Sequence, residues 1–341
     1  KYAAAAYLAK INIELEQWTE AIGNCNFVIS GPFDLLDNFG DLASLDFENA
    51  EESVFTIQFS TANIFANHNW GNLLNVTLGP GIDGGAYANG DDFYLASQNL
   101  VNAFKTDADG LPLFEDFNNS DVSGSFSGRL DPRIDHTVGR IGIPWKGTAN
   151  YDLNWVRSED YLPGYSGKKH VIAPDDPRVH NSFPWAASGL NFNVIRFAEV
   201  LLWKSEAIIE SNGNLDEARM LINRVRERAR NGEYVQSLGG SSDAANYQIG
   251  LYPASNWTQD YARQALRFER RLELAMEGHR FYDLLRWGIV SNTMNTYYAS
   301  EAEDAQYLEG ASFQTNKHEY LPIPQGEIDL APELYQQNPG Y

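Results

Sequence analysis

The sequence predicts a mostly α-helical fold, built from tetratricopeptide-like helical hairpins with long loop-rich insertions and a few short strands. Apolar residues recur at helical spacing towards both ends of the 341-residue chain. Small residues in these segments allow two helices to pack closely, as in a tetratricopeptide repeat. Between the ends, residues 61–190 lose this periodicity and are rich in Gly, Pro, Asn, Asp and aromatic residues. Together these features indicate a helical scaffold that presents long loops.

The first helical hairpin and a strand are predicted before the loops begin. Helical spacing covers residues 1–15 and 17–30, and Gly31-Pro32 ends the second helix. Residues 52–60 are rich in β-branched and aromatic side chains and alternate in part, which favours a short strand. Within the loop-rich region only residues 97–104 have a helical pattern.

Regular helix is predicted again after the loops. Residues 193–211 and 215–231 form a second hairpin, interrupted by Gly213-Asn214. A long helix follows over residues 258–278, and another over 280–287. The tail, from residue 319, is punctuated by proline and is expected to be extended, since proline fixes φ and lacks an N–H donor.

We expect one domain over residues 1–341 that is incomplete at its N-terminal side, because the chain opens as the middle of a helix. Its parts are a helical hairpin with a strand (1–60), a loop-rich, aromatic ligand-binding region (61–190), and a C-terminal helical scaffold with a tail (191–341).

The composition restricts the classes of ligand. The formal net charge is −21, and a surface of that sign repels nucleic acid and anionic lipid. No apolar run is long enough to span a bilayer. The single cysteine, Cys25, excludes an internal disulfide and is expected in the core. The histidines have no spacing typical of a metal site, so we predict neither metal nor cofactor.

One segment, RFERRLELAMEGHRFYDLLRWG at residues 267–288, has more charge than a solvent face needs. Glu273 and Glu277 share one helical face, and a pair of carboxylates is what glycoside hydrolysis requires. Arginines are interleaved with them, and a neighbouring guanidinium keeps a carboxylate ionised, which does not suit a general acid. We therefore interpret these charges as a scaffold, predict that the protein is not an enzyme, and keep a helical glycoside hydrolase as the weaker alternative.

The same segment resembles the C-terminal signature of the SusD/RagB family of nutrient-binding outer-membrane lipoproteins. Further segments resemble landmarks of that family in the same order. They are WTEAIGNCNFVIS with SVFTIQFS, SQNLVNAFKTDADGLPLF, DPRIDHTVGR, NVIRFAEVLLWKSEAIIESNGNLDEARMLINRVRERAR and YLPIPQGEIDLAPELYQQNPGY. The resemblance covers most of the chain and implies a SusD-like fold.

The resemblance implies a cell-surface protein that captures oligosaccharides or polysaccharide and delivers them to a SusC-like TonB-dependent transporter. It implies a location at the outer membrane through a lipid on an N-terminal cysteine, and this sequence lacks that cysteine. Some branches of the family bind peptides, so a peptide-binding RagB-like protein or a helical-repeat adaptor is the alternative.

A glycan site needs flat aromatic rings for sugar faces and polar side chains for hydroxyl groups. The loop-rich region offers both. The expected ligand-binding residues are Asn69, Trp70, Tyr87, Asp91, Phe93, Trp145, Trp155, Tyr165 and Trp185. Trp70 and Tyr87 rank highest because Gly and Asn surround them. For each of the others, packing beneath its own loop is the competing interpretation.

The sequence does not name the glycan. The acidic balance favours a neutral polymer such as a β-glucan over an anionic one such as alginate. An anionic polymer would instead suit a local basic patch, which four arginines could form: Arg129, Arg133, Arg140 and Arg157.

Overall fold

The computed structural model describes residues 1–62, 75–77, 79, 91–157, 164–180 and 187–341. They form two compact units, Lys1–Gly278 and His279–Tyr341. The boundary falls inside residues 191–341, which the sequence predicts as a helical scaffold followed by an extended tail.

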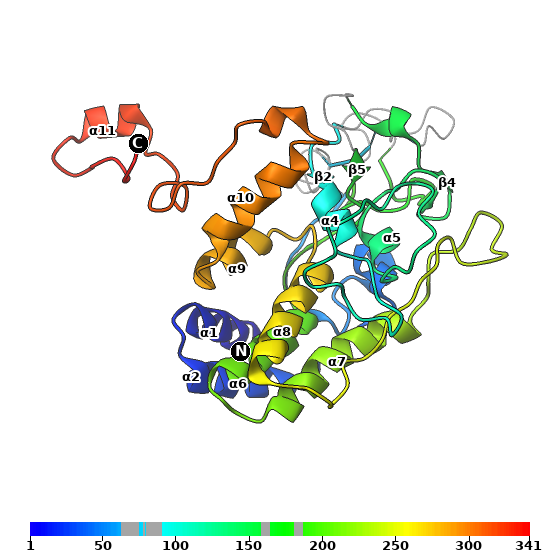
Figure 1. Cartoon of the computed structure of the whole chain (residues 1–341), viewed down its shortest axis with the longest axis horizontal. Helices are drawn as coiled ribbons and strands as arrows, with labels where there is room; N and C mark the ends of the chain where they lie inside the picture. Colours follow the sequence, from blue (N-terminus) through cyan, green and yellow to red (C-terminus); the bar gives the residue numbers. More distant parts are fainter. Residues whose placement is uncertain (63–74, 78, 80–90, 158–163, 181–186) are drawn as a thin grey trace. The chain divides into compact units, whose positions relative to one another are not determined.

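Five helices form the helical layer of the first unit (Figure 1). They are α1 (Tyr2–Glu14), α2 (Trp18–Ile29), α6 (Phe197–Glu210), α7 (Leu215–Asn231) and α8 (Gln259–Glu273). Helix α1 packs on α2, α2 on α6, and α6 on both α7 and α8. Small side chains at the contacts, such as Ala6, Ala9 and Ala21, are fully buried, so neighbouring backbones approach closely. Both predicted hairpins and the mostly helical fold class are confirmed.

Two predicted boundaries are wrong. Residues 193–196 belong to a strand, β6 (Phe192–Arg196), which pairs antiparallel with β1 (Ser53–Ile57). The apolar spacing of β6 merges with that of α6, so only its distant partner identifies it as a strand. Helix α8 ends at Glu273, before the predicted residue 278, and Met276 and Gly278 have φ angles of 63° and 82°. These positive φ angles lie in the left-handed region, where a residue cannot continue a right-handed helix.

The loop-rich region holds more short elements than predicted. Helix α4 (Gln98–Asn102) lies within the expected segment, and α5 (Ile134–Thr137) was not expected. The strands β2 (Leu95–Ala96) and β5 (Tyr165–Ser166) pair with each other, as do β3 (Pro144–Trp145) and β4 (Ala149–Asn150). These pairs lie above α7 and α8 in Figure 1. The region also holds a short 3-10 helix, η4 (Leu153–Trp155), and two others, η1 (Phe39–Ala43) and η2 (Leu45–Phe47), lie between α2 and β1.

The second unit has its own small core of Leu284, Val290 and Phe313. Its helices are α9 (Arg280–Arg286), α10 (Val290–Glu301) and α11 (Gln325–Leu330), with a 3-10 turn, η6 (Gln306–Leu308). Helix α11 corrects the prediction of a wholly extended tail; it begins just after Pro324, where the missing N–H costs no helical bond. Among the described residues, no helix combines the length and apolar character needed to cross a bilayer.

Candidate functional site

The charged segment of α8 lies inside the protein. The side chain of Glu273 has 0% exposure and accepts hydrogen bonds from Arg133 Nη1 at 3.1 Å and Arg196 Nη1 at 3.0 Å. Arg228 also pairs with it. Burial alone would raise the pKa of Glu273, but the guanidinium groups of Arg228, Arg196 and Arg133 outweigh burial and lower it to about 2. A carboxylate so enclosed and so acidic cannot protonate a leaving group, which argues against the hydrolase alternative at this position.

This ion network joins the helices to the loops. Arg133, in the loop before α5, also pairs with Glu269 of α8 at 2.6 Å. Lys169, just after β5, donates to Glu277 at 2.6 Å. Arg228 of α7 donates to Glu52, beside β1, at 2.9 Å. Buried pairs of this kind add little net stability over apolar packing, but they restrict the loops to one arrangement that satisfies every charge. The loop surface is therefore anchored on the helical layer.

The structure describes five of the nine predicted ligand residues. Asn69, Trp70, Tyr87 and Trp185 lie outside the described residues. Asp91 and Phe93 are accessible to solvent, and Trp155 is partly buried.

Trp145 and Tyr165 are corrections to the predicted site. Trp145 has 0% exposure; its ring stacks on Tyr151 with centroids 5.7 Å apart, and Gly139 lets the backbone approach it. Tyr165 is also buried, and its hydroxyl donates to Gln98 Oε1 at 2.7 Å. Neither ring offers a free face to a sugar. Both rings pack beneath their own loops, as the alternative to ligand contact predicted.

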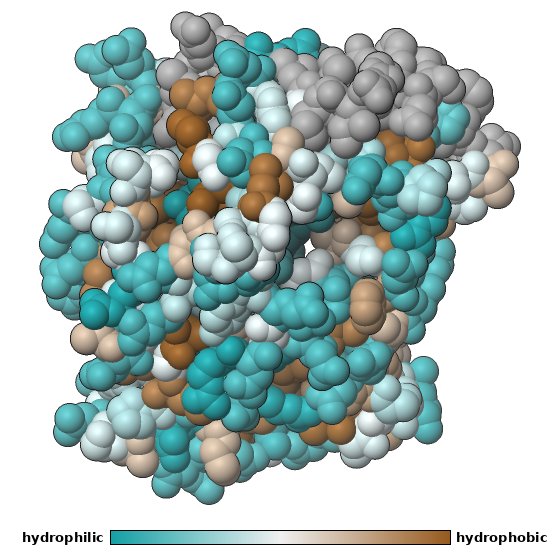
Figure 2. Space-filling model, turned by 90° about the vertical axis from the view of Figure 1, so that its right-hand side faces the viewer, coloured by the Kyte–Doolittle hydropathy of each residue, from teal (hydrophilic) through white to brown (hydrophobic). Residues whose placement is uncertain are grey.

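Phe93, Arg157 and Asp91 form an exposed cluster, hereafter the Phe93 surface. The Phe93 side chain is 58% exposed, and the Arg157 guanidinium lies 5.0 Å from its ring centroid. Arg157 also forms an ion pair with Asp91. An exposed ring beside a guanidinium and a carboxylate provides both a stacking face and hydrogen-bonding groups. On the face shown in Figure 2, hydrophilic side chains predominate and apolar ones form small groups.

The residue between Asp91 and Phe93 is buried and fixes this loop. Asp92 is 1% exposed and has a φ of 49°. Its backbone N–H donates to Val76 O at 3.0 Å, and its Oδ2 accepts from Ser166 Oγ at 3.1 Å. Burial raises the pKa of Asp92 to about 7, although the Ser166 hydrogen bond opposes the shift. The loop therefore turns outward at Phe93 because its neighbour is held inside.

Asp92→Asn is expected to flatten the pH dependence of stability. In the wild type the unfolded carboxyl ionises near its ordinary pKa of 3.8, whereas the folded one stays protonated until about pH 7. The free energy of unfolding should therefore fall as pH rises from about 4 to about 7. Urea unfolding of both proteins between pH 4 and pH 8 checks this. Identical slopes for the two proteins in that window would contradict the assignment.

Three of the four arginines of the suggested basic patch are paired with carboxylates. Arg133 is buried in the ion network, Arg140 pairs with Asp135 at 2.7 Å, and Arg157 pairs with Asp91. Their charges are thus matched by carboxylates. Within the described chain, no group of three metal-ligating side chains is placed to hold a metal ion.

One further feature has no recognisable motif in the sequence. A cavity of about 490 Å³ lies in the first unit, and its lining includes Lys146 and Lys168. Neither lysine belongs to a recognisable motif. The only local hint is Lys146-Gly147 between two short extended segments, which is typical of a hairpin turn that projects a side chain.

The family model and the curated proteins that match this chain indicate one family. The model of the SusD family matches residues 51–341. SusD-like protein P25 of Formosa agariphila is 26% identical over 365 residues, which cover 100% of this chain and 59% of that protein. This chain thus spans less than two thirds of the length of the curated relatives it matches.

Two solved structures have the same fold. One is a laminarin-binding SusD-like protein, with a TM-score of 0.57 and 24% identity, covering 100% of this chain and 62% of the other. The other is surface glycan-binding protein A from Bacteroides thetaiotaomicron, with a TM-score of 0.62 and 21% identity, covering 100% and 64%. At these identities the likeness establishes the fold.

Proposed function

This chain belongs to the SusD family, and from that premise we propose that it binds a glycan at the cell surface without making or breaking bonds. The observation that carries the proposal is the Phe93 surface, where an exposed ring lies beside a guanidinium and a carboxylate. The C–H face of a sugar can stack on the ring, and its hydroxyl groups can form hydrogen bonds with the charged groups. Two structures of the same fold are described as laminarin-binding and surface glycan-binding, which supports this ligand class.

The preferred ligand is a neutral polymer such as a β-glucan. The chain carries a net charge of −21, which repels an anionic polymer. At the Phe93 surface the charge of Arg157 is matched by Asp91, so no excess positive charge offsets that repulsion there. In this proposal the glycan passes to a SusC-like TonB-dependent transporter at the outer membrane, where a lipid on the N-terminal side anchors the protein. Family membership supports these last points.

Phe93→Ala is expected to weaken glycan binding by about 1–2 kcal/mol, roughly five- to thirtyfold, because the ring provides the stacking face. Affinity electrophoresis of the chain in native gels containing laminarin measures this effect. Alginate serves as the anionic polymer for comparison. Trp70→Ala, at a position predicted from the sequence, is run beside it.

Phe47→Ala is the matched control, since Phe47 is an exposed phenylalanine in η2, outside the Phe93 surface. It should migrate like the wild type. Retardation by laminarin that survives Phe93→Ala would remove the Phe93 surface from the proposal. No retardation by any polysaccharide would instead favour the peptide-binding alternative.

A further inference from the structure

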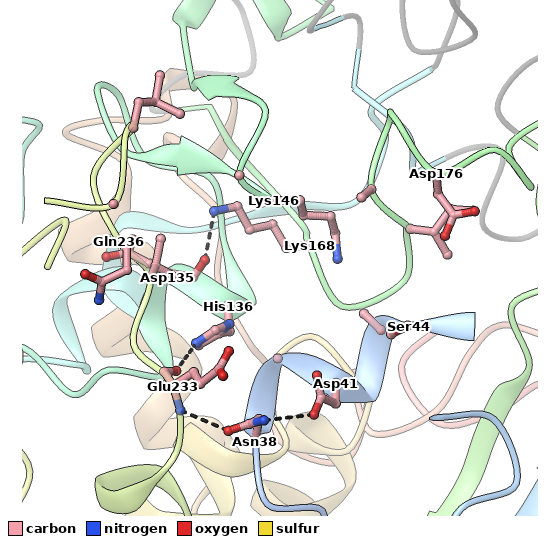
Figure 3. A pocket seen from close by; sticks show the side chains of 18 of the residues that line it. Asn38, Asp41, Ser44, Asp135, His136, Lys146, Lys168, Asp176, Glu233 and Gln236 are labelled. Atoms are coloured by element: carbon pink, nitrogen blue, oxygen red, sulfur yellow. Dashed lines mark hydrogen bonds between the residues drawn. The ribbon is translucent and has the colours of Figure 1, made fainter. Parts of the chain in front are cut away.

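The cavity of about 490 Å³ is separate from the Phe93 surface. It lies between η1, α5, the β3–β4 turn and the loop at residues 233–240 (Figure 3). Its lining contains none of the residues of the Phe93 surface. A volume of this size is typical of sites for small molecules. The side chains labelled in Figure 3 are all polar or charged.

Lys146 places an amino group at this cavity that has no carboxylate partner among the described residues. It is the first residue of the turn between β3 and β4, and Thr148 N closes that turn on Trp145 O at 3.0 Å. Its φ of 45° is uncommon for a residue other than glycine, asparagine or aspartate. Figure 3 shows its side chain reaching into the cavity. Within the described chain no carboxylate pairs with it, and the neighbouring charge that acts on it is that of Lys168.

Lys168 supplies a second positive charge and holds it in place. Its side chain is 2% exposed, and its Nζ donates to Asp135 O at 2.8 Å and to Pro144 O at 3.0 Å. The same Nζ lies 5.4 Å from the centroid of the Trp145 ring. Both hydrogen bonds go to neutral carbonyl groups, and the nearby Asp135 carboxylate favours the charged form of Lys168. The charge of Lys168 disfavours the charged form of Lys146, and an anion between the two ammonium groups would relieve that repulsion.

Two of the acidic groups on the lining, Asp135 and Asp176, are held by arginines. Asp135 is held by Arg140 through Nε at 2.8 Å and Nη2 at 2.7 Å. Asp176 is held in the same way by Arg178, at 2.8 and 2.7 Å. Their charges are therefore already matched by guanidinium groups.

Uncharged and acidic acceptors gather on the opposite side of the cavity. Asp41 Oδ2 accepts from Asn38 Nδ2 at 3.1 Å, and Asn38 Oδ1 accepts from the backbone N–H of Glu233 at 3.0 Å. In Figure 3 these three residues lie away from Lys146, with His136 between them and the lysines. Carboxylate and amide oxygens are good acceptors for hydroxyl hydrogens. The cavity thus has a cationic end and an end suited to hydroxyl groups.

We propose that this cavity is a second binding site, which takes a small polyhydroxylated anion such as a hexuronate sugar. The anionic group would lie against Lys146 and Lys168, and the hydroxyl groups against Asn38, Asp41 and Glu233. The proposal does not depend on glycan binding at the Phe93 surface, because the two sites share no residue. It also separates the ligand classes: the Phe93 surface takes a neutral polymer, whereas the cavity takes a small anion.

Binding at this site should weaken as pH rises. Burial and the charge of Lys168 lower the pKa of Lys146 to about 7, and burial lowers that of Lys168 to about 8. Both ammonium groups are charged at pH 6 and largely neutral at pH 9, so the anion loses its partners across that range. The other titratable groups that face the cavity are Asp41, Asp135, His136, Asp176 and Glu233.

Isothermal titration of the chain with glucuronate, glucose and inorganic sulfate tests the proposal. We expect glucuronate to bind more tightly than either glucose or sulfate, since only glucuronate has both the charge and the hydroxyl groups. Lys146→Gln should weaken glucuronate binding by about tenfold or more, because it removes a charged hydrogen-bond donor. Repeating the titration at pH 6 and pH 9 should show weaker binding at the higher pH.

Two control variants separate this site from general effects. Lys1→Gln removes the charge of an exposed lysine that does not line the cavity, and it should leave glucuronate binding unchanged. Phe93→Ala should also leave it unchanged, while Lys146→Gln should leave retardation by laminarin unchanged. Absence of glucuronate binding, equal affinity for sulfate, or unchanged affinity in Lys146→Gln would each overturn the proposal. The failure of laminarin binding alone would overturn only the function proposed for the Phe93 surface.

Discussion

Glu273→Ala is expected to lower the free energy of unfolding by about 3–5 kcal/mol, because it leaves buried guanidinium groups without their carboxylate. Glu273 has 0% exposure and bonds to Arg133, Arg196 and Arg228. Removing one partner from a buried network costs far more than the network contributes relative to apolar packing. Urea unfolding followed by circular dichroism at pH 7 measures the change.

Glu115→Gln is the control for this variant, since Glu115 is an exposed carboxylate in the same unit. It should change the free energy of unfolding by less than about 0.5 kcal/mol. A loss in Glu273→Ala as small as that of the control would show that the network is not held as described.

Glu273 also makes the stability that the network contributes depend on pH. The pKa of Glu273 is lowered from 4.5 to about 2 in the folded protein, so its contribution to stability is complete above pH 4.5. That contribution is lost as pH falls through the interval from 4.5 to 2. The Glu273→Ala variant lacks it, so the difference in stability between the two proteins should shrink across that interval.

Trp145→Ala is expected to cost about 3–5 kcal/mol in the free energy of unfolding, as large-to-small changes of buried aromatic residues do. The Trp145 ring is enclosed by Tyr151, Trp155 and the Lys168 ammonium group. Its removal leaves a cavity beneath the β3–β4 turn. Thermal and urea unfolding measure the loss, and laminarin electrophoresis at a temperature where the variant is folded measures binding.

Trp155→Ala is the comparison, because Trp155 is only partly buried against the same cluster. It should cost less than Trp145→Ala. If Trp145→Ala abolished laminarin binding while the free energy of unfolding stayed unchanged, Trp145 would be a ligand residue after all, and its assignment to the core would be wrong.

The sequence by itself predicted the helical hairpins. Helices α1, α2 and α7 begin and end within a residue or so of their expected bounds. Their apolar spacing follows the 3.6-residue turn, which is a property of the local chain. Breakers such as Gly31-Pro32 and the N-cap Asn214, whose side chain accepts from the N–H groups of Asp216 and Glu217, act over a few residues only. The interleaved charges of the signature segment were also enough to predict a scaffold.

Tertiary structure decided what depends on distant partners. Strand β6 was predicted as helix because its pairing with β1 joins residues about 140 positions apart, which local spacing does not register. Trp145 and Phe93 both lie in irregular loops, yet one is buried and the other exposed. Because apolar residues in such loops do not recur at a regular spacing, the sequence does not indicate which side chains face the core. The two lysines of the cavity, 22 positions apart in the sequence, meet only because β3 and the loop after β5 fold together. In helices and strands the spacing of apolar residues predicts which side chains are buried. In loops, burial depends on the distant residues that pack against them.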